Sequence, residues 1–310
     1  MILFALLSIF TAGPVSEARL CNAFKEKCWI HKGDSSYTPA YPSKSTRLKI
    51  NPSEVPLEKS WGVEAIMYAS EFDFALVRGL GRVGAAISPT NSEETFFGHP
   101  GFEIPPEFLE RMRDKKKYES QKITLAGAFG LWGNKKHGLR RVQINLGAIG
   151  KYNTETDSVW PGAGVSAVVG PFTLGYSVGQ DETLIDMTDY GLENEKFRYN
   201  SETFSAGIYM NSLALDYSYV RITASDLEPI HVSLLTGSVL LRRWILTIAG
   251  RREASERPAY DFKTQTLVAE DVKRETFGGV QFAATRFLMI GCFHNYYLLR
   301  EISIGAILFF

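Results

Sequence analysis

The chain has 310 residues, and its 34 Lys and Arg residues balance its 34 Asp and Glu residues, so the formal net charge is +0. A neutral chain without a basic tract argues against nucleic acid as a partner, because that affinity comes mostly from neutralising phosphates. The mean hydropathy of -0.08 is typical of a water-soluble protein. It does not exclude a membrane β-barrel, since barrel strands turn only every second side chain toward lipid.

Residues 1–18 are predicted to be a signal peptide. An apolar run extends from Ile2 to Phe10, and the small or polar residues Ser16 and Ala18 follow it, which favours secretion with cleavage after Ala18. The apolar run is too short to cross a bilayer as a helix. We therefore expect the mature chain to begin near Arg19 and to reach the periplasm of a bacterium.

Residues 19–60 carry no sustained hydrophobic period, and four prolines interrupt them: Pro39, Pro42, Pro52 and Pro56. One interpretation is a disordered periplasmic tail. The other is a plug folded inside a barrel, where irregular backbone can lie at membrane depth. Cys21 and Cys28 either close a small loop through a disulfide in an oxidising periplasm or remain two free thiols.

From Trp61 onward, apolar and polar residues alternate with the period of two that marks β-strands. The predicted strands number roughly fourteen, an even count that is usual for bacterial single-chain barrels. Their spans are 61–69, 71–78, 80–89, 121–132, 139–152, 160–169, 171–180, 201–210, 212–222, 229–241, 243–252, 271–285, 287–298 and 302–310.

The lengths of the connections separate two architectures that share this alternation. A soluble antiparallel sandwich would turn the apolar face inward, and a membrane barrel would turn it outward. Tight turns, such as the one at residues 169–172, alternate with long charged links such as 181–199 and 253–269. Short periplasmic turns and longer external loops are typical of outer-membrane barrels. We therefore predict an all-β fold: a transmembrane antiparallel up-and-down β-barrel over residues 61–310, with residues 19–60 as an irregular plug.

The alternation also predicts which side chains face lipid and which face the lumen. On one strand, Leu213, Leu215, Tyr217 and Tyr219 are assigned to lipid, and Ala214, Asp216 and Ser218 to the lumen. The same parity assigns four charged residues to the lumen: Lys122, Arg141, Lys151 and Asp216. Buried charges require partners, so we expect these groups to hold the plug through hydrogen bonds and ion pairs rather than to form a selectivity filter.

The last strand ends on aromatic residues. Its residues Ser303, Gly305, Leu308 and Phe310 resemble the C-terminal signal of bacterial outer-membrane β-barrels, in which a polar residue, a glycine and hydrophobic positions precede a final aromatic residue. The resemblance implies the barrel assembly machinery as a partner. A soluble β-domain whose last strand happens to end in Phe is the alternative.

Two stretches resemble the FadL-type outer-membrane channels for hydrophobic molecules. Residues 79–87 are Gly-rich, and residues 92–101 are similar to the family's Phe-Phe-Asn-Pro-Ala-Gly run, with Gly98-His99-Pro100 in place of Asn-Pro-Ala. Asn51-Pro52 is a second, shorter similarity. The resemblance implies a barrel with an N-terminal plug that carries the Asn51-Pro52 motif, and passage of small hydrophobic molecules.

Little in the sequence indicates catalysis. The five histidines are scattered, without Cys or His pairs at metal-ligand spacing, so neither a metal nor a cofactor is predicted. His231 and Ser233 lie two apart on one strand face, a spacing that resembles the catalytic pair of the outer-membrane phospholipase, but no third member is evident. The acidic residues Asp181, Glu182, Asp186 and Asp189 are expected in a solvated external loop.

The leading hypothesis is a passive outer-membrane channel, not an enzyme, in contact with outer-membrane lipid and with a small hydrophobic solute. The first alternative is a surface barrel without transport whose external loops bind a partner. The second is an outer-membrane hydrolase, and it depends on His231 and Ser233 alone.

Overall fold

The computed structural model describes residues 51–55, 57, 59–68, 71–90, 122–133, 142–154, 156–185, 195–210, 213–224, 227–255, 258–261, 266–269, 273–295 and 302–309. The predicted signal peptide, Cys21, Cys28, Arg141, Asp186, Asp189 and Phe310 lie outside these residues, as does the FadL-like stretch 92–101. Among the described residues, no helix is both long enough and apolar enough to cross a membrane.

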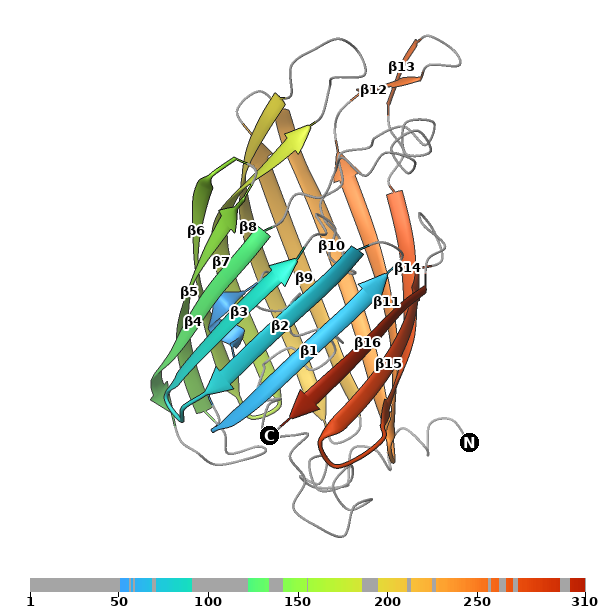
Figure 1. Cartoon of the computed structure of the whole chain (residues 1–310). Coiled ribbons are helices and arrows are strands. Elements are labelled where there is room, and N and C mark those ends of the chain that lie inside the picture. The colour runs from blue at the N-terminus through green and yellow to red at the C-terminus, as the bar shows by residue number, and fades with distance from the viewer. Residues whose placement is uncertain are drawn as a thin grey trace.

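Fourteen antiparallel strands form a closed barrel (Figure 1). They are β1 (Ser60–Tyr68), β2 (Glu71–Gly79), β3 (Val83–Thr90), β4 (Lys122–Gly133), β5 (Val142–Asn153), β6 (Ser158–Val169), β7 (Phe172–Ile185), β8 (Glu195–Met210), β9 (Leu213–Ala224), β10 (Leu227–Leu241), β11 (Trp244–Ser255), β14 (Lys273–Ala283), β15 (Leu288–Asn295) and β16 (Ile302–Phe309).

Closure depends on the last strand. β16 pairs with its sequence neighbour β15 on one side and with β1 on the other, in a register that runs from Gly62 opposite Phe309 to Tyr68 opposite Ser303. Each of the other barrel strands pairs with its neighbours along the chain, β11 pairing with β14 across an inserted hairpin. The barrel therefore has no free edge strand, and its backbone N–H and C=O groups can be satisfied without water.

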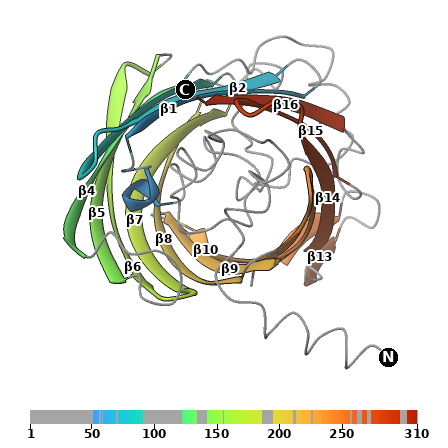
Figure 2. The same ribbon diagram turned by 90° about the horizontal axis from the view of Figure 1, so that it is seen from below.

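Two further elements are not part of the wall. β12 (Pro258–Asp261) and β13 (Thr266–Ala269) form a separate two-stranded sheet beyond the upper rim, at the opposite end from the point where β16 ends (Figure 1). The 3-10 turn η1 (Pro52–Glu54) lies inside the ring of strands, where it contacts β4, β5 and β6 (Figure 2).

The side chains follow the predicted alternation. On β9, Leu215 is 41% exposed and Tyr217 is 40% exposed, whereas Asp216 and Ser218 are buried on the opposite face. Because the second face encloses η1, the exposed apolar face is the outside of the barrel. The outward positions include Phe72, Leu125, Phe129, Leu174, Phe204, Leu235, Val239, Leu246, Ile248, Ile290, Ile302 and Ile304. This arrangement confirms the predicted barrel and contradicts a sandwich with a dry apolar core.

The sequence prediction is wrong about where several strands end. β7 continues to Ile185, β8 begins at Glu195, and β11 continues to Ser255, so the two links predicted at 181–199 and 253–269 both contain strand. Asp181 and Glu182, expected in a solvated loop, are instead buried residues of β7. The sequence prediction ended these strands where charged residues begin. The structure shows that the paired strands continue past their apolar segments, where polar side chains carry no cost of contact with hydrocarbon.

Candidate functional site in the barrel lumen

The Asn51 to Val55 segment folds into one compact turn against the inner wall. Asn51 is the N-cap of η1, and its side-chain Oδ1 accepts hydrogen bonds from the backbone N–H of Ser53 at 3.1 Å and from the Ser53 hydroxyl at 2.8 Å. Pro52 occupies the first position of the turn, where its fixed φ and missing N–H carry no penalty. Asn51 Nδ2 also donates to the Val165 carbonyl oxygen at 3.3 Å, which fastens the turn to β6.

Three glycines of the wall make room for this segment, and we call them the plug seat: Gly147, Gly164 and Gly175. Gly147 and Gly164 lie opposite each other on β5 and β6. A Cβ on Gly147 would come within 2.2 Å of the Ser53 backbone nitrogen, and one on Gly164 within 2.2 Å of Asn51 Oδ1. A Cβ on Gly175 would lie 2.7 Å from Asn51 Nδ2. The inner wall therefore accepts the segment only because these positions lack side chains.

Beyond the turn, the chain packs into an apolar strip of the lumen. Val55 and Leu57 are buried in one cluster with small and branched residues of β2 to β5: Ala75, Val77, Ala86, Ala126, Ala128 and Ile149. The Gly81 N–H donates to the Leu57 carbonyl oxygen at 2.6 Å, which fixes the segment near the β2–β3 turn. The lumen wall on β6 to β10 is polar instead, with buried residues that include Ser166, Ser177, Thr203, Ser205, Ser218 and Thr236.

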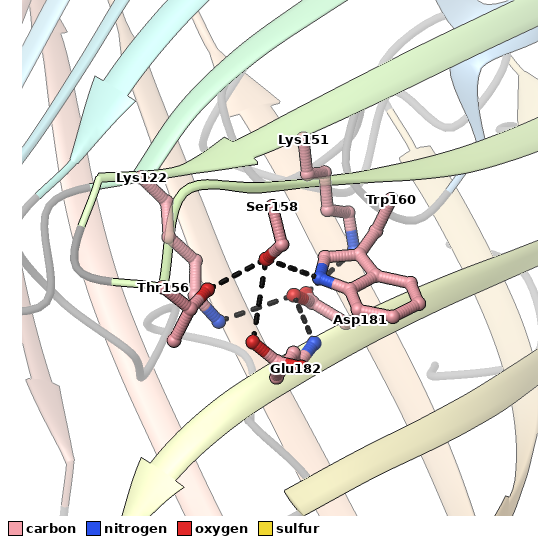
Figure 3. Close-up of polar contacts among 7 residues, drawn as sticks. All are labelled: Lys122, Lys151, Thr156, Ser158, Trp160, Asp181 and Glu182. Carbon is pink, nitrogen blue, oxygen red and sulfur yellow. Dashed lines mark hydrogen bonds and ion pairs between the residues drawn. The ribbon is translucent and has the colours of Figure 1, made fainter. Parts of the chain in front are cut away.

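Nearer the upper rim, a buried carboxylate joins three strands (Figure 3). Asp181 Oδ1 lies 3.2 Å from Lys122 Nζ, and Asp181 Oδ2 lies 2.9 Å from Lys151 Nζ. The three side chains come from β4, β5 and β7 and are largely buried. A buried charge is stable only when it is paired, so this triad links strands that are not all neighbours.

A second group, around Glu182, adjoins the triad. Glu182 Oε2 accepts from Arg198 Nε at 2.8 Å, and Glu182 Oε1 accepts from the Ser158 hydroxyl at 3.3 Å. Ser158 in turn accepts from Trp160 Nε1 at 2.9 Å, and the Arg198 guanidinium lies 5.2 Å from the centre of the Trp160 ring. The carboxylate thus accepts hydrogen bonds from β6 and β8. Figure 3 shows its contact with Ser158.

The Glu182 group stands where the backbone pairing between β6 and β7 stops. Their register runs from Val169 opposite Phe172 only to Gly162 opposite Gly179. Above that pair, β6 continues to pair with β5, and β7 continues to pair with β8 as far as Ile185. The side-chain contacts of Ser158, Trp160, Glu182 and Arg198 therefore connect two hairpins where no ladder is recorded between them.

The predicted site residues that the structure describes lie in three places: at the plug seat, on the lumen face of the wall and on β16. Asn51 and Pro52 lie together against the plug seat, and Lys122, Lys151 and Asp216 face the lumen as predicted. Among the described residues, Lys122 and Lys151 form ion pairs with the wall residue Asp181. Their expected contacts with residues 19–50 lie outside the described part of the chain. Ser303, Gly305 and Leu308 lie on β16 within the pairs that close the barrel.

His231 and Ser233 lie on the outer wall, on the same face of β10 as the exposed Leu235. His231 Nδ1 is hydrogen-bonded to the Tyr219 hydroxyl at 2.6 Å, and the Ser233 hydroxyl lies 3.3 Å from that of Tyr217. Each of the two residues is thus bonded to a tyrosine of β9, an arrangement that gives the serine no imidazole as a base. Within the described part of the chain, no group of three His, Cys, Asp or Glu residues could hold a metal ion.

Sequence reasoning missed the plug seat and the Asp181 triad. The glycines of the seat could have been found from their parity, because Gly147, Gly164 and Gly175 all fall on lumen-facing positions. Asp181 carried no such signal, since its partners are 30 and 59 residues away in the sequence.

The sequence matches no family model and no curated protein. Similar solved structures include the Acinetobacter baumannii outer membrane protein Omp33, which is 9% identical over 81% of this chain and 96% of that chain, with a TM-score of 0.41. Salmonella typhi OmpF in complex with daunomycin is 8% identical over 81% and 96% of the two chains, with a TM-score of 0.39. The outer membrane channel DcaP of Acinetobacter baumannii is 8% identical over 81% and 95%, with a TM-score of 0.37. The barrel described above is established by its own strand pairing, and similarity this low carries no statement about solute or activity.

Proposed function

We propose that this chain is a bacterial outer-membrane β-barrel that lets small hydrophobic molecules pass, with the N-terminal segment as its plug. The observation that carries the proposal is the seating of Asn51 to Leu57 in the lumen, on three glycines and an apolar strip. The outward ring of Leu, Ile, Val and Phe side chains supports a location in the membrane, since a closed barrel with an apolar outer surface is compatible with the hydrocarbon core of a bilayer.

The apolar strip of the lumen supports the proposal that the solute is hydrophobic. Val55 and Leu57 cover six apolar wall residues, so movement of this segment would uncover an apolar path along β2 to β5. A molecule with little polarity could replace Val55 and Leu57 there without leaving buried polar groups unpaired, whereas a sugar would lose hydrogen bonds with water.

The direct test is solute entry into intact cells. Cells with the gene deleted are compared with cells that carry it, using a panel of hydrophobic and hydrophilic solutes of similar size. We expect the deletion to slow entry of the hydrophobic members and to leave the hydrophilic members unchanged. Equal uptake of every solute by both strains would remove the channel proposal.

A second candidate function is a surface barrel that binds a partner through its external loops. The sheet of β12 and β13 favours it, because this hairpin stands beyond the upper rim and adds nothing to the wall (Figure 1). Deletion of residues 258–269 separates the two functions. Loss of surface binding with unchanged solute entry would support the surface role, and intact binding would remove it.

A further inference from the structure

The outer wall changes character near the upper rim of β9, β10 and β11. Toward the middle of these strands, the outward positions are apolar, including Leu215, Leu235 and Ile248. Toward the upper rim, the outward positions become Arg221, His231, Ser233 and Arg252, which we call the outer basic patch. Polar side chains of this kind are costly against hydrocarbon and nearly free at the interface with the headgroups.

The register brings the four residues of the patch together. Arg221 on β9 lies directly opposite His231 on β10, and Ser233 on β10 lies directly opposite Arg252 on β11. Residues that face each other across antiparallel strands have Cβ atoms about 4.5 to 5.5 Å apart. Two guanidinium groups, a hydroxyl and an imidazole therefore occupy one small area of the outer wall.

Two tyrosines support the patch from below. The Tyr219 ring stacks on the His231 ring with centroids 5.7 Å apart, and its hydroxyl is bonded to His231 Nδ1. The Tyr217 hydroxyl contacts the Ser233 hydroxyl in the same way. These contacts limit the rotation of His231 and Ser233, so less side-chain entropy is lost when a ligand binds.

The charge of the patch is positive. Arg221 Nη1 lies 3.8 Å from Glu202 Oε2, and both side chains are about half exposed, so this ion pair is weak. Arg252 is exposed and lies opposite Ser233 rather than a carboxylate. Arginine is well suited to an oxyanion because its planar group can donate two parallel hydrogen bonds.

The position of the outer basic patch along the barrel axis indicates which kind of molecule would supply an anion to it. Tyr217 and Tyr219 are outward aromatic residues of the type that marks a membrane interface. Arg221 follows Tyr219 by two positions, which is roughly 7 Å of strand toward the rim. We propose that the outer basic patch binds the phosphate group of a lipid in the outer leaflet. This inference rests on the proposed membrane location, and it assigns a lipid to one side of the barrel.

The experiment measures lipid binding to the full-length protein in detergent. The probes are phosphatidic acid and diacylglycerol with the same acyl chains, which differ only in the phosphate. We expect the protein to bind phosphatidic acid at least about tenfold more tightly, because only this lipid offers the oxyanion. The double variant Arg221→Gln with Arg252→Gln should lose that preference.

The matched control is Arg78→Gln. Arg78 is an exposed arginine of the outer wall at the opposite rim, where it lies over the Trp61 ring at 4.4 Å, and its loss should leave lipid preference unchanged. Equal binding of both lipids, or an unchanged preference in the double variant, would overturn the proposal. Binding of inorganic phosphate alone that disappears in the double variant would assign the patch to a soluble phosphate and overturn the lipid source.

The failure of this inference can be told apart from failure of the proposed function. Membrane recovery and the gel shift of the folded barrel are recorded for every variant. A membrane-inserted, folded protein without lipid preference contradicts the patch alone. A protein found outside the membrane contradicts the proposed function.

Discussion

Gly147 is the residue at which the plug seat can be tested most directly. We expect Gly147→Ala to displace the Asn51 to Val55 turn, because the added Cβ would lie 2.2 Å from the Ser53 backbone nitrogen. The measurement is hydrogen exchange at the Ser53 amide, which the Asn51 side chain protects in the seated turn. Exchange should become faster, and entry of hydrophobic solutes should increase with it.

Gly150→Ala supplies the control for that substitution on the same strand. A Cβ on Gly150 meets no atom within 4 Å, so this variant adds the same methyl group without a collision. Its Ser53 amide should exchange at the wild-type rate. Unchanged protection in Gly147→Ala would show that the turn does not depend on the seat.

Asp181 is the residue on which the upper triad depends. Asp181→Asn removes the charge that pairs with Lys122 and Lys151 and leaves two buried ammonium groups without it. Breaking a buried pair from one side typically lowers the free energy of unfolding by about 3 to 5 kcal/mol. Urea unfolding of the protein in lipid vesicles measures this change.

An exposed ion pair is the comparison for the buried triad. Glu202→Gln removes the partner of Arg221, and exposed pairs contribute roughly 0 to 1 kcal/mol. A loss in Asp181→Asn no larger than in Glu202→Gln would mean that the triad adds little to the stability of the wall.

At the scale of elements, the turn between β10 and β11 places a residue with a Cβ in the left-handed region. Leu241 pairs with Trp244, so Arg242 and Arg243 alone make the turn, and Arg242 has a φ of 57°. The left-handed region costs a residue with a Cβ about 1 to 2 kcal/mol. Glycine adopts it readily, as Gly170 does with a φ of 60° in the turn between β6 and β7.

We therefore expect Arg242→Gly to raise the free energy of unfolding by roughly 1 kcal/mol. The matched variant is Arg243→Gly, whose φ is not in the left-handed region, so glycine relieves no strain there and adds chain entropy to the unfolded state. Urea unfolding distinguishes them. Equal effects of the two substitutions would contradict the argument from φ.

At the scale of the molecule, closure of the barrel makes a prediction about assembly. β16 pairs with both β15 and β1, so a defect at its end removes backbone pairing from one edge of each of these two strands. We propose that Phe310 completes the assembly signal that Ser303, Gly305 and Leu308 begin. Removal of Phe310 should reduce recovery from the outer membrane and weaken the mobility difference between unboiled and boiled samples on gels.

The control for the last residue is removal of one residue from a loop. A chain without residue 264, between β12 and β13, has the same length as the chain without Phe310 but keeps an intact β16. It should be recovered normally with the full gel shift. Normal recovery of the chain that lacks Phe310 would remove the proposed signal, and absence of any gel shift in the wild type would contradict the membrane barrel.

The sequence by itself determined the number of barrel strands, their approximate positions and the two faces of the wall, but it missed β12 and β13. Side chains in a strand alternate between its faces, so the assignment of Leu215 and Tyr217 to the outside and of Asp216 to the lumen needs no partner strand. The short and long links then fixed the up-and-down order. Both kinds of information are local, and the closed fourteen-stranded barrel confirms them.

Only the tertiary structure decided which of these residues meet. Gly147, Gly164 and Gly175 are ordinary barrel glycines until the Asn51 turn lies on them, more than ninety residues away in sequence for each glycine. Asp181 reads as a loop residue until Lys122 and Lys151 approach it from β4 and β5. Contacts of this kind depend on the register between strands and on the path of the chain through the lumen. Neither can be derived from the alternation of side chains within any one strand.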